Sequence, residues 1–77
     1  MSKLVNQPVE VVLENGFPRR FFFHKSFLIH HIQEYWREAG QWWLGETERF
    51  VYQVVTDYGV SELHYLPSTD SWILYRL

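Results

Sequence analysis

The chain contains four histidines, the residues best suited to bind a metal ion or to move a proton near neutral pH. His30 and His31 are sequence neighbours, and neighbouring side chains of a strand point to opposite faces, so they cannot easily share one ion. His24 shares a face with His31 but is too distant along the strand, and His64 could join only through tertiary contact. We therefore predict no metal site.

Groups for covalent or acid-base catalysis are also poorly arranged. No serine lies in a Gly-x-Ser-x-Gly turn, and no histidine and aspartate have the spacing of a catalytic triad. The glutamate pairs 34/38 and 46/48 are most simply solvated charges, and the isolated glycines form no phosphate-binding loop. We expect no catalytic residue, no cofactor and no enzymatic activity.

Aromatic residues are the most prominent feature of the composition. Six Phe, five Tyr and four Trp make up 19% of the 77 residues. Each ring can remove roughly 150–250 Å² from water, and a chain of this length forms one core, so we expect a single domain over residues 1–77 with some rings at its surface. In Trp42-Trp43 one ring can point inward and the other outward, and the sequence does not decide which.

Charge and cysteine content narrow the possible partners and the compartment. Seven Lys and Arg against nine Asp and Glu give a net charge of −2, which argues against wholesale binding to nucleic acid or to an anionic membrane. The absence of cysteine fits a reducing compartment, so we expect a cytoplasmic protein. No secretory signal or apolar stretch of membrane-spanning length is recognisable.

Turn signals divide the chain into short strands. Asn15-Gly16 is the strongest hairpin signal, Gly59 ends a short loop after Asp57, and residues 67–70 form the last turn. Residues 49–56 alternate most regularly, with Phe50 and Tyr52 on one face. The expected strands cover residues 9–13, 19–24, 27–36, 49–56, 60–66 and 71–77. This pattern predicts an all-β antiparallel meander of five or six strands curled into a small open barrel.

Residues 27–39 allow a second interpretation, as a helix. Ser26 could cap its start and Gly40 its end. The residues on its apolar face would be Leu28, Ile32, Tyr35 and Ala39. That helix would make the fold α+β. We favour a long, bent strand, because β-branched and aromatic residues flank the segment with hairpin spacing.

The preceding hairpin separates its side chains into two faces. A turn at Lys25-Ser26 would set Phe23 opposite Leu28 and Phe21 opposite His30. The face with Phe21 and Phe23 is then the predicted core face. The other face mixes apolar and basic groups and is expected to be partly exposed: Arg20, Phe22, His24, Phe27, Ile29 and His31.

These features together predict a non-catalytic binding module that docks on a protein partner or associates with itself. The candidate docking residues are Phe22, Phe27, Ile29, Trp42 and Trp43. One alternative is an accessory nucleic-acid-binding domain, in which rings stack on bases while cations contact phosphates. The cations for that role are Arg19, Arg20 and Lys25. A second alternative is a barrel that binds a small ligand.

The order of several motifs resembles a small uncharacterised bacterial domain family. The shared elements are Arg19-Arg20-Phe21, Gly40-x-Trp42-Trp43, the strand Arg49-Phe50-Val51-Tyr52 and Trp72-Ile73-Leu74, and the likeness extends from about Pro8 to Leu77. Its most specific element is Gly-x-Trp-Trp followed by an Arg-aromatic strand. Some members are associated with genes for Y-family (translesion) DNA polymerases. The resemblance therefore implies an accessory context in DNA repair and no known catalytic residue.

Overall fold

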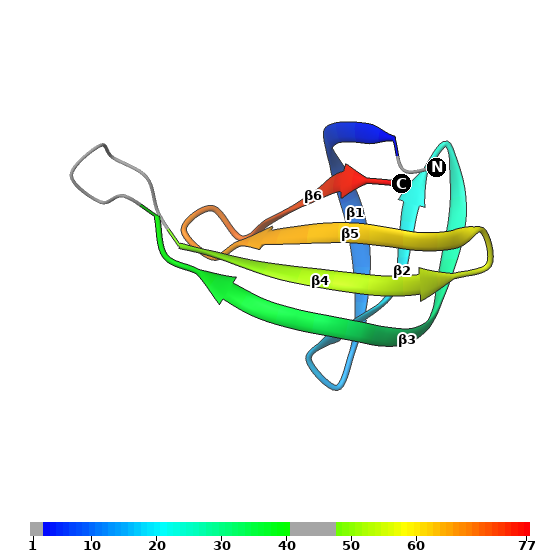
Figure 1. The fold of residues 1–77 in the computed structure, drawn as a ribbon, viewed down its shortest axis with the longest axis horizontal. Coiled ribbons are helices and arrows are strands. Elements are labelled where there is room, and N and C mark those ends of the chain that lie inside the picture. The colour runs from blue at the N-terminus through cyan, green and yellow to red at the C-terminus, as the bar shows by residue number, and fades with distance from the viewer. Residues whose placement is uncertain (1–2, 41–47) are drawn as a thin grey trace.

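The computed structural model describes residues 3–40 and 48–77, so the candidate docking residues Trp42 and Trp43 lie outside the described residues. Six antiparallel strands close into a barrel in chain order (Figure 1). They are β1 (Leu4–Glu14), β2 (Phe17–Phe23), β3 (Lys25–Glu38), β4 (Arg49–Thr56), β5 (Gly59–Leu66) and β6 (Ser71–Arg76). The predicted all-β barrel is confirmed.

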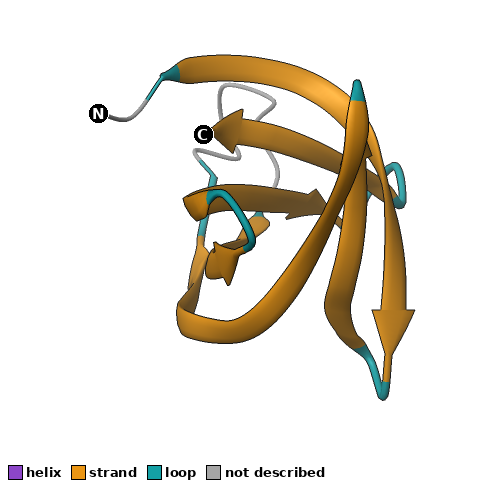
Figure 2. Cartoon of the chain, turned by 90° about the vertical axis from the view of Figure 1, so that its right-hand side faces the viewer, coloured by secondary structure: helices purple, strands orange, loops and turns teal. Residues whose placement is uncertain are grey.

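The described part of the chain contains no helix (Figure 2). The alternative helix at residues 27–39 is therefore wrong, because residues 27–38 belong to β3, which ends at Glu38. No helix among the described residues could cross a membrane.

The barrel is closed rather than open, because the first and last strands pair with each other. Leu4 lies opposite Arg76, and Val9 lies opposite Trp72. The backbone N–H of Lys3 donates to the Leu77 carbonyl at 2.8 Å, and the Leu77 N–H donates back to Lys3 at 2.9 Å. This pairing covers the two edges that an open meander would leave exposed.

Two long strands, β1 and β3, each change partner along their length. β1 pairs with β6 up to Val9 and with β2 over residues 10–14. β3 pairs with β2 over residues 25–28 and with β4 over residues 29–38. The wall therefore has two seams where neighbouring strands diverge. Hollows of about 270 Å³ and 430 Å³ lie at the β2/β3 and β1/β6 seams, respectively.

The turns explain which part of the register could be predicted. Asn15 and Gly16 have φ values of 55° and 83°, as the predicted hairpin requires. The predicted turn at Lys25-Ser26 is wrong, since His24 alone, with φ of 62°, separates β2 from β3. Phe21 consequently lies opposite Phe27 rather than His30. This shift by an odd number of residues exchanges the two faces at the start of β3.

The exchange moves two candidate docking residues into the core. Phe27 and Ile29 are only 3% and 2% exposed, so the expectation that they form an exposed face is wrong. The Phe27 ring stacks on Phe21, with ring centroids 4.7 Å apart and planes 3° from parallel. Within residues 3–40 and 48–77, the buried core cluster consists of Phe21, Phe27, Ile29, Val54, Leu63 and Leu74.

The two neighbouring phenylalanines of β2 provide a matched test of this arrangement. We expect Phe21→Ala to lower the free energy of unfolding by about 3–5 kcal/mol, because a fully buried ring is replaced by a cavity. Phe22→Ala, at a position 40% exposed, should cost about 1 kcal/mol or less. Chemical denaturation of both variants measures the difference, and equal losses would contradict the observed register.

Candidate functional site

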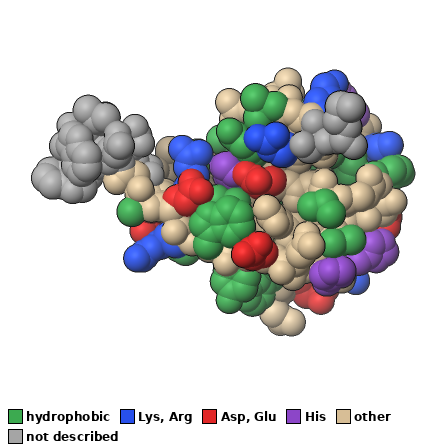
Figure 3. Space-filling model, viewed as in Figure 1, with side chains coloured by type: hydrophobic (Ala, Val, Ile, Leu, Met, Phe, Trp, Pro, Cys, Tyr) green, Lys and Arg blue, Asp and Glu red, His purple; other side chains and the backbone are tan. Residues whose placement is uncertain are grey.

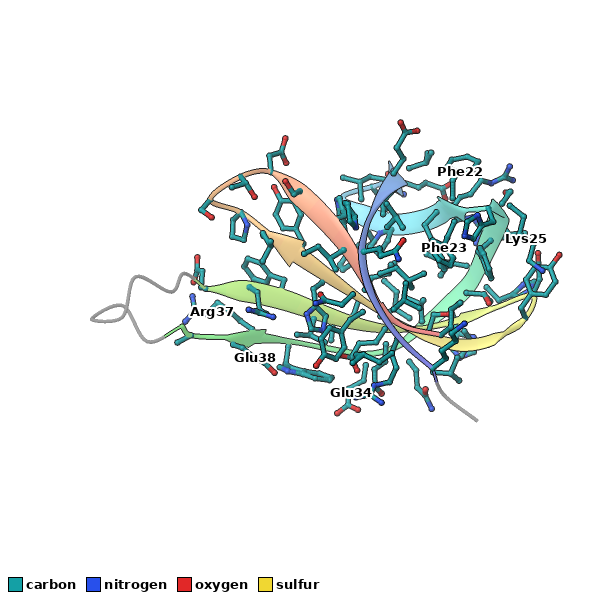
Figure 4. All side chains as sticks on the ribbon, turned by 90° about the horizontal axis from the view of Figure 1, so that it is seen from above. Phe22, Phe23, Lys25, Glu34, Arg37 and Glu38 are labelled. Carbon is teal, nitrogen blue, oxygen red and sulfur yellow. The ribbon has the colours of Figure 1, made fainter. Side chains whose placement is uncertain are left out.

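The remaining predicted docking residue, Phe22, lies on the outside of the barrel. Its side chain points away from the barrel, whereas that of Phe23 points inward (Figure 4). Because Phe27 and Ile29 are buried and the two tryptophans lie outside the described residues, Phe22 has no exposed partner from the predicted set. The docking surface predicted from the sequence is not assembled by the described residues.

The three cations predicted for nucleic-acid binding are also not brought together. The Arg19 guanidinium donates to the Ile29 carbonyl at 2.8 Å, across the β2/β3 seam. The Lys25 ammonium lies 3.7 Å from the centroid of the Tyr58 ring, at the turn between β4 and β5. Arg20, next to Arg19 in β2, points to the opposite face of the strand. These side chains do not line one groove.

A different surface is formed by six aromatic rings, which we call the aromatic row. Phe17 meets Tyr35 edge-on at 5.9 Å, and Tyr35 stacks on Tyr52 at 5.9 Å between ring centroids. Tyr52 continues to Trp72 at 5.4 Å, and Trp72 continues to Tyr65 at 4.9 Å. Phe50, 6.4 Å from Tyr65, is the last ring of the row among the described residues. The row thus links residues of β2, β3, β4, β6 and β5.

Strand pairing places these rings together on the inner face of the sheet. Tyr35 lies opposite Tyr52, while Tyr65 lies opposite both Phe50 on β4 and Trp72 on β6. Cross-strand aromatic pairs of this kind each contribute roughly 0.2–1 kcal/mol. The predicted alternation of β4, with Phe50 and Tyr52 on one face, agrees with this placement.

The aromatic row runs from the core to the surface. Tyr52 and Trp72 pack against the core cluster. Tyr35 and Phe17, at the other end, are 59% and 43% exposed. The exposed rings are therefore held in place by contacts with rings that the core itself fixes.

Two tyrosine hydroxyls of the row, those of Tyr52 and Tyr65, are held in their neutral form. Tyr65 donates a hydrogen bond to Asp70 at 2.6 Å, and this bond, followed by burial and the Asp70 charge, raises the pKa of Tyr65. Burial, and secondarily the charge of Tyr35, raises the pKa of Tyr52. The row therefore presents apolar rings with neutral hydrogen-bonding groups near neutral pH.

Most of the row is not evident from the sequence. The alternation of residues 49–56 was a sufficient signal for Phe50 and Tyr52. Tyr35 joins them only through the pairing of β3 with β4, in which His30 and Gln33 are extra residues without a partner. Two such bulges reset which side chains face inward, and no residue pattern in the segment marks them.

The outer face of the same sheet carries a polar network around His64. Arg49 Nη1 donates to His64 Nδ1 at 3.3 Å, and His64 Nε2 lies 2.6 Å from Glu62 Oε2. A guanidinium can only donate, so Nδ1 accepts and the imidazole proton lies on Nε2, where it is donated to Glu62. Tyr75 stacks on the imidazole with ring centroids 4.4 Å apart.

A bulge in β6 makes this stacking possible. Glu62 lies opposite Arg76, but the next residue, Leu63, lies opposite Leu74, so Tyr75 is the extra residue. In Figure 3, histidine, acidic and hydrophobic side chains lie side by side on the face turned to the viewer. His64 is only 4% exposed, so the network ties three strands together and offers no open site.

The described residues contain no group of three or more histidine, aspartate and glutamate side chains that could hold a metal ion. His30 forms a pair with Asp57, with 2.6 Å between Nε2 and Oδ1, at the surface. No family model, curated protein or solved structure matches the chain.

Replacement of His64 tests the role of the network. We expect His64→Ala to lower the free energy of unfolding by about 2–3 kcal/mol, because it removes a buried ring and leaves Arg49 and Glu62 without their shared partner. His31→Ala, at an exposed position of β3, should change stability by about 0.5 kcal/mol or less. A His64→Ala variant as stable as His31→Ala in thermal unfolding would contradict this role.

The raised pKa of Tyr52 determines how this residue makes the free energy of unfolding depend on pH. The pKa of Tyr52 is raised above its ordinary value of 10.0, so at high pH the folded state binds more protons than the unfolded state. This contribution to stability is complete below about pH 10 and is lost as the pH rises further. Denaturation at stepped alkaline pH should show a shallower decline for Tyr52→Phe than for the parent protein. Identical declines would contradict the prediction.

Proposed function

We propose that the chain is a non-catalytic binding module that docks on a protein partner through the aromatic row. The observation that carries the proposal is the continuity between the exposed rings of Phe17 and Tyr35 and the rings packed on the core. Tyrosine and tryptophan dominate the energetics of many protein interfaces, since they provide a large contact area with few rotatable bonds.

Pre-organisation favours this role. A side chain that is already fixed loses little entropy on binding, whereas a free side chain costs about 0.5–1.5 kcal/mol to immobilise. Tyr35 is held between Phe17 and Tyr52, so its ring is positioned before a partner arrives. The neutral hydroxyls of Tyr52 and Tyr65 add hydrogen-bonding capacity without the cost of burying a charge.

The charges beside the row favour a protein over a nucleic acid. Arg37, opposite Phe50 and next to the row, is paired with Glu48 at 3.6 Å. Asp70 adds a negative charge at Tyr65. A nucleic-acid site needs cations that follow the phosphates, and Arg19 and Lys25 are already engaged elsewhere. The sequence resemblance makes a Y-family polymerase the first partner to test.

The test is capture of a partner from cells that produce the protein, quantified by mass spectrometry. Wild-type bait should retain a specific protein, and Phe17→Ala with Tyr35→Ala should lower its recovery at least about tenfold, as expected when interface anchors are removed. Tyr58→Ala is the matched control, because Tyr58 is similarly exposed but lies in the turn between β4 and β5. Equal recovery with all baits would contradict docking through the row.

The nucleic-acid alternative is tested on the same protein. Titration with a single-stranded oligonucleotide at two salt concentrations should show no saturable binding if the row serves protein docking. Tight binding that weakens steeply with salt and is lost in Arg19→Gln with Arg20→Gln would favour the alternative instead.

A further inference from the structure

One edge of β3 is left without a strand partner beside the aromatic row. β3 pairs with β2 only over residues 25–28, so on that side residues 29–38 have no strand partner within residues 3–40 and 48–77. Residues 34–38 pair with β4 in regular register, after the two bulges at His30 and Gln33. A regular edge strand presents unpaired backbone N–H and C=O groups to any extended chain that approaches.

The side chains of this edge are divided by charge. Glu34 and Glu38 are exposed and point to one side of β3, whereas Arg37 points to the other side (Figure 4). Trp36 lies between the two glutamates, and its Nε1 donates to Glu38 at 3.1 Å. Arg37 is paired with Glu48. Glu34 and Glu38 therefore make the outer side of the edge acidic. On the inner side, the exposed ring of Tyr35 offers an apolar contact.

We propose that residues 34–38 bind an extended segment of a partner protein by strand addition, and that this segment alternates basic and apolar residues. Alternate side chains of an added strand face opposite sides of the sheet. Basic ones on the outer side meet Glu34 and Glu38, and apolar ones on the inner side meet Tyr35. The inference rests on the proposed function and specifies the chemistry of the partner.

Charge also argues against a second copy of the chain as the occupant. A two-fold pairing of antiparallel β3 edges that uses all of residues 34–38 is centred on Trp36 and sets Glu34 opposite Glu38 of the other copy. Like charges directly opposite each other destabilise a strand pair. The same carboxylates that accept a basic strand thus oppose self-pairing.

The probe is a short blocked peptide in which lysine and valine alternate, titrated into the isotope-labelled full chain. We expect saturable binding with the largest amide shifts at residues 34–38. A peptide of the same length with glutamate in place of lysine should bind at least about tenfold more weakly. Two further peptides are N-methylated, one at its odd-numbered and the other at its even-numbered residues. Only one of the two should lose binding, because only every second N–H group of an added strand faces β3.

A pair of charge variants serves as matched control. Glu34→Gln with Glu38→Gln should weaken peptide binding about three- to tenfold. Glu10→Gln with Glu14→Gln removes the same charge from β1 and should leave binding unchanged. No binding of the lysine peptide, shifts away from residues 34–38, equal effects of both double variants, or a dimer formed through β3 would each overturn the strand-addition proposal.

The two proposals fail separately. If the lysine peptide does not bind but loss of Phe17 and Tyr35 still abolishes partner capture, docking through the row stands and strand addition falls. If the peptide binds at residues 34–38 but loss of Phe17 and Tyr35 leaves partner capture unchanged, the edge of β3 is the docking site and the proposed role of the row is wrong.

Discussion

The stacking of Phe21 on Phe27 is the contact on which the rest of the structure depends. It exists because His24 adopts a left-handed backbone conformation and joins β2 to β3 without any further residue. Once Phe27 faces inward, Ile29 follows it into the core. The two bulges of β3 then bring Ile32 and Tyr35 to the same side. The core and the aromatic row are therefore successive parts of one inner face.

The two faces of the β3–β6 sheet are stabilised in different ways. On the outer face, Val51 is fully buried, and the polar groups of Arg49, His64 and Glu62 satisfy one another. On the inner face, the rings of the row bury one another only in part, and Tyr35 remains largely exposed. A partner that covers the inner face would gain apolar burial without breaking polar contacts of the sheet.

The sequence predicted the fold class and several elements, because these depend on local signals. Asn15 and Gly16 fixed the first hairpin, and the alternation of residues 49–56 fixed β4 to the residue. The candidate docking residues depended on a turn that was predicted at the wrong position. A histidine with positive φ has no strong sequence signature, and moving the turn from Lys25-Ser26 to His24 turned Phe27 and Ile29 from surface into core. Tyr35 and Trp72 join the row only through long-range strand register, which brings each of them to Tyr52.

Site-specific photo-crosslinking in cells tests whether the aromatic row is the docking surface. A photoreactive phenylalanine derivative replaces Tyr35 in one version of the protein and Tyr58 in another, since both side chains are exposed but lie in different parts of the barrel. Docking through the row should give a covalent complex with one protein from position 35 and none from position 58. No crosslink from position 35, or equal crosslinks from both positions, would contradict it.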